Sequence, residues 1–270
     1  MTVSYQGVPG LDVGLRNGIL TLTMDDASRR NALNDNTVAH LIAALRTAST
    51  DDEVRAVLLA GANGDFCSGF DIVDRNAGAT TRPRVGSIQR RLPHQAHALI
   101  PLLAELQLPI IAAVHGYAVG IGLQILLACD FVVASSTATL WEPFSSRGMT
   151  PDSGCTWLLP RVVGPVWARR MLLLGERLTG AQAVECGIVY QALDDEAVDE
   201  AAHQLASRLA AGPTVALGLT RHLLNASAEH TLGEQLESEA LALELSSRSP
   251  DFKEGLRAFI AKRPPEFTGQ

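Results

Sequence analysis

The segment from Leu108 to Cys129, LPIIAAVHGYAVGIGLQILLAC, is informative about the fold because it contains no Asp, Glu, Lys or Arg. Its length approaches that of a membrane-spanning helix. Pro109 opens the segment, however, and three glycines interrupt it, which argues against one continuous helix. The segment is therefore predicted to form a buried strand, Ile110–Val114, a glycine-rich turn and a buried helix, Ile121–Ala128, rather than a membrane span.

Short strands and helices alternate on both sides of this segment, which predicts an α/β fold through about residue 200. Asn17-Gly18 joins two apolar runs and is typical of a β-hairpin, and Val54–Ala60 is a continuous apolar strand. We expect residues 1–200 to form the core and residues 201–270 a helical region. The other expected elements are strands Asp12–Arg16, Ile19–Met24 and Phe131–Ala134, helices Asp35–Ser49, Pro93–Gln107, Ala201–Ala211, Val215–Ser227, Leu232–Ser246 and Pro250–Ala261, and a mobile loop over residues 73–90.

The composition of the 270-residue chain excludes several classes of protein. Apolar residues make up 47% and charged residues 19%, which excludes a disordered chain. The formal net charge of −7 provides no overall attraction to nucleic acids or anionic lipids. The N-terminus has no basic segment followed by an apolar run, so we expect no secretory signal. The four cysteines form no C-x-x-C pair and are typical of a reducing compartment, so a cytoplasmic location is expected.

Two glycine-containing turns follow buried strands and are candidates for stabilising a negative charge. Residues 66–72, FCSGFDI, follow the strand at Val54–Ala60, whereas residues 116–122, GYAVGIG, follow Ile110–Val114 and open a helix. Glycine lets another group approach the backbone closely, and a helix start presents unpaired N–H groups. Two such turns side by side would direct two N–H donors at one oxyanion. The alternative is that both glycine clusters only make tight turns.

Four sequence blocks together resemble the crotonase (enoyl-CoA hydratase/isomerase) superfamily. They are residues 30–33 (RNAL), 66–72, 116–122 and the C-terminal segment 259–267 (FIAKRPPEF). The resemblance implies a crotonase-type spiral of ββα turns with a C-terminal helical subdomain, assembled as a homotrimer or a dimer of trimers. It also implies an enzyme that binds acyl-CoA thioesters and stabilises a thioester enolate. It implies no metal or redox cofactor, because CoA arrives as part of the substrate.

The resemblance assigns site residues position by position. The two oxyanion N–H groups fall at Phe70 and Ile121, where the family usually has glycine at the second position. Arg29 or Arg30 could meet the CoA phosphates, because guanidinium pairs well with phosphate, and the alternative is a solvated surface charge. The residues expected to contact CoA are Arg30, Ala32, Ser68, Gly69, Asp71, Ile72, Gly120, Phe259 and Lys262, the last two often from a neighbouring subunit.

Two departures from the family pattern bear on the reaction. The resemblance implies two glutamates in a hydratase, and this chain has Gln124 and Phe144 at those positions. Neither side chain titrates, so hydration by two glutamates is not expected. Glu142 lies close in sequence and is an alternative acid or base, although we expect it to face solvent or to cap local backbone. His115 is expected to be structural.

Asp152 supplies a different carboxylate. Residues 151–161, PDSGCTWLLPR, resemble the ring 1,2-epoxyphenylacetyl-CoA isomerases of bacterial phenylacetate degradation, and isomerase branches of the superfamily use an aspartate here as acid and base. Burial among Phe70, Phe144 and Trp157 would suit a proton shuttle, whereas the alternative is that Asp152 caps a helix at 153–159. We therefore predict an acyl-CoA isomerase, of enoyl-CoA or ring-epoxide or oxepin type. The alternatives are an enoyl-CoA hydratase of fatty-acid or aromatic-acid breakdown and a non-catalytic acyl-CoA-binding protein.

Overall fold

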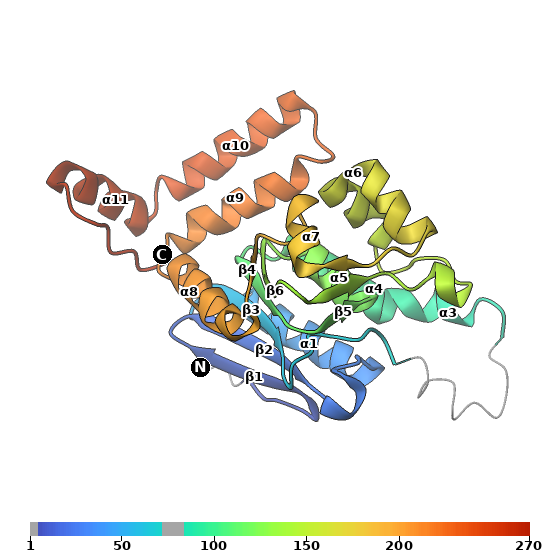
Figure 1. Ribbon diagram of the computed structural model, residues 1–270. Coiled ribbons are helices and arrows are strands. Elements are labelled where there is room, and N and C mark those ends of the chain that lie inside the picture. Colours follow the sequence, from blue (N-terminus) through green and yellow to red (C-terminus); the bar gives the residue numbers. More distant parts are fainter. Residues whose placement is uncertain (1–4, 72–83) are drawn as a thin grey trace.

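A six-stranded sheet is the main element of the computed structural model, which describes residues 5–71 and 84–270 (Figure 1). Ile72 and most of the expected loop at 73–90 lie outside the described residues. All neighbouring strands of this sheet are parallel except the first two, which form the predicted hairpin. In spatial order the strands are β1 (Gly10–Arg16), β2 (Ile19–Asp25), β3 (Ala56–Gly61), β4 (Ile110–Val114), β6 (Phe131–Ser135) and β9 (Gln191–Leu193).

A smaller sheet contains three strands, β5 (Tyr117–Val119), β7 (Thr139–Trp141) and β8 (Leu178–Thr179). The chain passes from β4 to β5 through a sharp turn at Gly116, whose φ is +49°. A Cβ atom at this position would lie 2.3 Å from the carbonyl oxygen of Gly64, so glycine is required there. The segment from residue 108 to 129 thus forms the strand, turn and helix that its sequence predicts.

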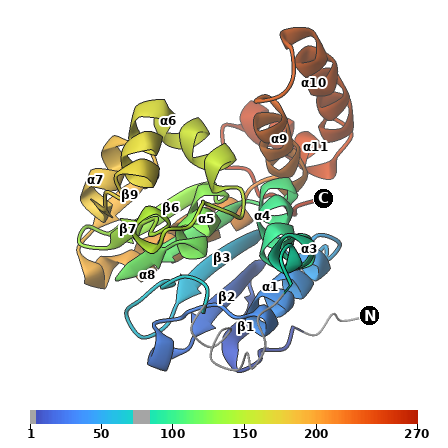
Figure 2. The same cartoon turned by 90° about the vertical axis from the view of Figure 1, so that its right-hand side faces the viewer.

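Both faces of the large sheet are buried at its central strands β3, β4 and β6, as their continuous apolar runs predict, whereas the edge strand β1 exposes Asp12, Gly14 and Arg16. In β3, Val57 packs in one hydrophobic cluster with α1 (Asp35–Ala48). The next residue, Leu58, packs in a second cluster with α8 (Val198–Ala210). Successive strand residues point to opposite faces, so α1 and α8 cover opposite sides of the sheet (Figure 2).

The helices predicted after residue 211 are present as α9 (Thr214–Ala226), α10 (Leu232–Ser246) and α11 (Pro250–Ala261), whereas α8, expected as the first helix of the C-terminal region, packs against the large sheet. Figure 1 shows these helices extending away from the large sheet. Arg221 attaches α9 to the core, because its buried guanidinium forms an ion pair with Asp130 at 2.7 Å. The same group donates hydrogen bonds to backbone carbonyls of the neighbouring core helices.

The remaining helices are shorter or differ from expectation. The α3 helix lies inside the expected loop at 73–90, and Ile88 is its one aliphatic residue, too few to give a helical period. No helix in the described ranges is long and apolar enough to cross a membrane. The helices are α3 (Ser87–Arg91), α4 (Ala96–Glu105), α5 (Ile121–Leu127), α6 (Cys155–Leu173) and α7 (Gly180–Glu185), with 3-10 turns at Ala27–Arg29, Leu92–His94, Ser145–Arg147 and Asp195–Ala197.

Candidate active site

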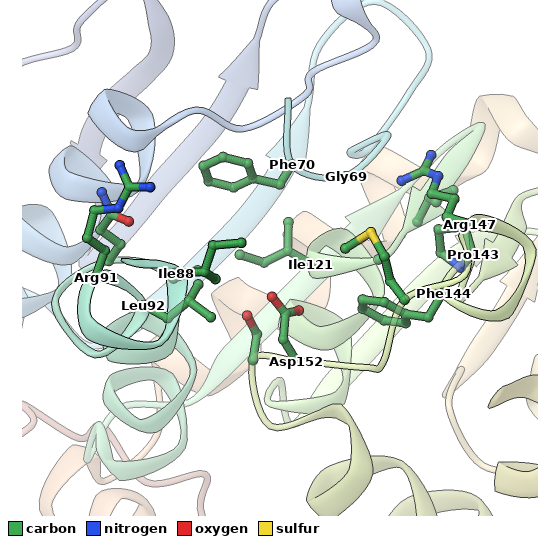
Figure 3. Close-up of a pocket in the computed structure, with 16 residues that line it drawn as sticks. Gly69, Phe70, Ile88, Arg91, Leu92, Ile121, Pro143, Phe144, Arg147 and Asp152 are labelled. Carbon is green, nitrogen blue, oxygen red and sulfur yellow. The ribbon is translucent and has the colours of Figure 1, made fainter. Parts of the chain in front are cut away.

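A cavity of about 420 Å³ lies between α3, the start of α5 and the segment that precedes α6 (Figure 3). Phe70, Ile121 and Asp152, the three predicted catalytic residues, all line this cavity. The Asp152 carboxylate points toward Ile121, and the Phe70 ring lies on the opposite side (Figure 3). The volume suits a small organic group. The other lining residues are mostly apolar and are Gly69, Ile88, Arg91, Leu92, Gln95, Ala96, Val119, Gly120, Pro143, Phe144, Arg147, Met149 and Ser153.

The two glycine-containing turns are joined directly by backbone hydrogen bonds. The Cys67 N–H donates to the Tyr117 carbonyl at 2.7 Å, and the Val119 N–H donates to the Cys67 carbonyl at 2.9 Å. Gly122 makes this approach possible, because a Cβ atom there would lie 2.7 Å from the Cys67 carbonyl oxygen. The turns therefore lie side by side, as an oxyanion site requires.

The backbone geometry sets the directions of the N–H groups of Phe70 and Ile121. The Leu33 N–H donates to Gly69 and the Asp71 N–H donates to Leu33, at 2.9 and 2.8 Å. Because N–H directions alternate along an extended chain, the Phe70 N–H points to the side opposite Leu33. Ile121 is the first residue of α5, a position whose N–H has no acceptor within the helix.

Asp152 lies on a tight turn before α6 and is not the N-cap of that helix. The helix begins at Cys155 and its N-cap is Gly154, so the alternative role of Asp152 as a helix cap is wrong. The physical reason is the backbone of the turn, because Ser153 and Gly154 both have positive φ, +50° and +81°, and stop the helix from starting earlier. His97 of α4 holds the turn, since its Nε2 accepts the Ser153 N–H at 3.1 Å.

Fewer aromatic side chains line the cavity than the sequence predicts. Phe70 and Phe144 line it, but Trp157 lies on the outer face of α6 with 41% of its surface exposed. Its ring is covered by the Arg161 guanidinium at 3.8 Å. Trp157 therefore does not help to bury Asp152, contrary to the expectation.

The predicted CoA-contact residues near the first turn form one connected wall. The Ser68 N–H donates to the Arg30 carbonyl at 3.0 Å, and the Ser68 hydroxyl donates to the Arg29 carbonyl at 2.7 Å. The Arg29 guanidinium forms an ion pair with Asp71, and the Arg30 guanidinium lies 5.0 Å from the centre of the Tyr117 ring. Both arginines are exposed, as the alternative of solvated surface charges describes, and they also make contacts within this wall.

The other predicted CoA-contact residues are divided between three places. Gly69 and Gly120 line the cavity. Ala32 lines a separate polar hollow of about 890 Å³. Phe259 and Lys262 lie at the end of α11, which is at the opposite end of the molecule from α3 (Figure 1). Within one chain, the described residues do not bring these last two to the cavity.

The expectation that Glu142 faces solvent or caps backbone is wrong, because its side chain is fully buried. The Cys155 thiol donates to Glu142 Oε1 at 3.4 Å. Desolvation raises the pKa of Glu142 to about 8, so it is a neutral acid at pH 7. Glu142 does not line the cavity, so its carboxyl group is not presented to a water molecule there.

Sequence reasoning missed several residues of the cavity and its surroundings. Arg91 and Arg147 flank it on opposite sides (Figure 3), and His97 supports it from α4. A single sequence gave no signal for the two arginines, since each lies on an irregular or very short element. No group of three or more His, Cys, Asp or Glu side chains in residues 5–71 and 84–270 is placed to hold a metal ion.

His115 connects the second turn to the segment before α8. Its ring nitrogens lie 3.0 Å from Asp195 and 2.9 Å from Asp199. Desolvation lowers the pKa of His115, but the hydrogen bonds with Asp199 and Asp195 outweigh it, and the pKa is raised overall. These contacts agree with the structural role expected for His115.

Comparisons with known proteins give consistent results. Residues 14–270 match the family model for enoyl-CoA hydratase/isomerase. The chain is 41% identical to 1,2-epoxyphenylacetyl-CoA isomerase of Escherichia coli (strain K12), over 94% of this chain and 96% of that protein. It is 33% identical to 2,3-dehydroadipyl-CoA hydratase of the same organism, over 96% and 99%. The crystal structure of an enoyl-CoA hydratase from Polaromonas sp. JS666 matches with a TM-score of 0.88 and 30% identity, over 95% of this chain and 99% of that one.

Proposed function

The chain belongs to the enoyl-CoA hydratase/isomerase family, and from that premise we propose that it is an acyl-CoA isomerase. The observation that carries the proposal is Asp152, a carboxylate that points into the cavity (Figure 3). Gln124 and Phe144 occupy the positions where hydratases are expected to have glutamates. The 41% identity to 1,2-epoxyphenylacetyl-CoA isomerase supports the same reaction class.

The proposed reaction moves one proton along the acyl chain. The thioester oxygen lies between the N–H groups of Phe70 and Ile121. Asp152 accepts a proton from the carbon next to the thioester carbonyl, and the electron pair of that C–H bond forms the enolate. The two N–H groups stabilise the negative oxygen. The protonated Asp152 then returns the proton two carbons further along a 3-enoyl chain, and the double bond moves into conjugation with the thioester.

The principal alternative is enoyl-CoA hydration, which relatives such as the 33% identical 2,3-dehydroadipyl-CoA hydratase favour. In this chain the nearest candidate for a water-activating glutamate is Glu142. Glu142 is completely buried and is not among the residues that line the cavity, so it is poorly placed to contact a water molecule there. A non-catalytic acyl-CoA-binding protein is less well supported, because such a protein needs no carboxylate in the cavity.

We also propose that the protein self-associates, as a homotrimer or a dimer of trimers. The C-terminal helices expose many large apolar side chains, which commonly mark a protein interface. A neighbouring copy could then bring Phe259 and Lys262 to the CoA moiety. The exposed large apolar residues of α9 to α11 are Val215, Leu224, Leu232, Leu236, Leu241, Leu243, Leu245, Phe252, Leu256, Phe259 and Ile260.

The reaction class is tested by product mass. The purified protein is incubated separately with trans-3-hexenoyl-CoA and trans-2-hexenoyl-CoA. The products are separated by chromatography and their masses are measured by mass spectrometry. An isomerase converts the 3-enoyl ester into the 2-enoyl ester without a change in mass. A hydratase adds the mass of one water to the 2-enoyl ester. Rapid water addition that depends on Glu142 and is indifferent to Asp152 would refute the isomerase proposal.

A further inference from the structure

Three fully buried polar side chains, Gln124, Glu142 and Cys155, lie behind the wall of the cavity. Gln124 is one helical turn after Ile121 in α5. Glu142 directly precedes Pro143, a lining residue, and Cys155 is the first residue of α6. Each of the three is thus connected to a different segment that forms the cavity.

The contacts of this cluster lead to the turn that carries Asp152. The Cys155 thiol donates to Glu142 Oε1 at 3.4 Å, and the Cys155 N–H donates to the Asp152 carbonyl at 3.0 Å. Burial and the neighbouring carboxyl groups raise the pKa of the Cys155 thiol, so it remains a hydrogen-bond donor. Glu142 is therefore linked to the Asp152 turn through a single residue.

The protonation state of Glu142 affects the hydrogen bonds of the cluster, because the cluster contains few other polar groups. Within the described residues, Glu142 Oε2 and both polar atoms of the Gln124 amide have no hydrogen-bond partner. A neutral carboxyl group supplies an O–H donor, and a carboxylate supplies none. The groups that act on Glu142 are Asp152 from the turn, Cys155 from α6 and Gln124 from α5. Asp152 is the one carboxyl group among them, and its negative charge disfavours the ionisation of Glu142.

We propose that Glu142, as a neutral carboxylic acid, is a positioning residue that acts through Cys155 to hold the Asp152 turn at the start of α6. The effect of this positioning on catalysis rests on the proposed function, whereas the positioning itself does not. When Glu142 ionises, its negative charge and that of Asp152 lie close together in a region of low dielectric and repel each other. The Asp152 turn is then released from its position relative to Ile121, and proton transfer slows.

Two variants separate positioning from simple folding. Glu142→Gln retains a neutral polar group of similar size, whereas Glu142→Leu retains the approximate volume without hydrogen bonds. Glu105→Gln, at the exposed end of α4, is the matched control. We expect Glu142→Leu to lower kcat on trans-3-hexenoyl-CoA by about 10- to 10²-fold with little change in KM, because small misplacements of a reacting group have effects of this order. Glu142→Gln should restore most of kcat.

The pH dependence of kcat gives a readout that a merely structural role would not change. The wild-type protein and Glu105→Gln should lose activity as pH rises above about 8, the pKa of Glu142. Glu142→Gln should lack this alkaline decline. An identical decline in Glu142→Gln would overturn the proposal, as would full kcat in a folded Glu142→Leu.

Hydrogen–deuterium exchange tests the same proposal without turnover. A peptide covering residues 149–158 is followed at pH 7 and pH 9, with correction for intrinsic exchange. We expect wild-type protection of this peptide to fall by about tenfold at pH 9, following the ionised fraction of Glu142, and protection in Glu142→Gln to stay constant. Equal behaviour of the two proteins would overturn the positioning role. Absence of any wild-type isomerisation would instead refute the proposed function, so the two failures are distinguishable.

Discussion

Replacing Glu142 with glutamine should change how the stability of the protein depends on pH. Glu142 is fully buried, and desolvation raises its pKa from the ordinary value of 4.5 to about 8. Below pH 4.5 the folded and unfolded chains both hold this proton. Between pH 4.5 and 8 the unfolded chain releases the proton and the folded chain retains it. The free energy of unfolding must therefore fall as pH rises through this interval.

The magnitude follows from the difference between the two pKa values. Each pH unit between them lowers the free energy of unfolding by about 1.4 kcal/mol, or roughly 5 kcal/mol over the whole interval. Glu142→Gln has no proton to release at this position and lacks this contribution. Between pH 5 and pH 7 the variant should therefore gain about 2 to 3 kcal/mol relative to the wild-type protein.

Urea unfolding at pH 5, 6, 7 and 8 measures this difference, with both proteins at one fixed concentration because self-association would also shift stability. Other ionisable groups contribute equally to both proteins and cancel in the comparison. The free energy of unfolding of the variant minus that of the wild-type protein should rise by about 2 to 3 kcal/mol between pH 5 and pH 7. Parallel curves would refute the reasoning, because they would show that Glu142 ionises equally in the folded and unfolded chains.

Three further substitutions have separate consequences. Lys262→Ala should weaken CoA binding in calorimetric titrations and reduce its salt dependence, since ions screen a charge–phosphate contact, whereas Lys253→Ala on the same helix should change neither. Arg221→Met should lower the free energy of urea unfolding by about 3 to 5 kcal/mol, because it removes the buried partner of Asp130; a loss below 1 kcal/mol would contradict the anchoring role. Gly122→Ala should lower kcat by on the order of 10²-fold by displacing the two turns, and unchanged turnover would contradict the oxyanion geometry.

The regular elements of the core were predictable because their hydrophobic patterns are local. Ile110–Val114 is a strand with the predicted bounds, and Pro250–Ala261 is a helix with the predicted bounds. The strand is a short apolar run that follows proline, and the helix begins with Ser249 as its N-cap and proline at its first position. Both signals act within a few residues, so tertiary packing did not change the outcome.

The site was less predictable wherever a side chain depends on distant segments. Glu142 was expected at the surface because carboxylates are seldom buried, yet α5 and α6 enclose it. The alternative of a cap at Asp152 was wrong because it considered only the preference of Asp for helix N-termini, Pro151 before it and the helical pattern after it. Gly154 carried the missing signal, because glycine after serine allows the two positive φ angles that delay the helix.

Deuterium incorporation by Asp152→Asn tests the assignment of the proton shuttle most directly. The wild-type protein and the variant are incubated with trans-3-hexenoyl-CoA in heavy water, and deuterium in the 2-enoyl product and the recovered substrate is measured by mass spectrometry. Asparagine preserves the shape of the side chain but cannot exchange a proton, so isomerisation and exchange should both fall by about 10²-fold or more. Wild-type rates of isomerisation and exchange in the folded variant would contradict the assignment of Asp152 as the group that moves the proton.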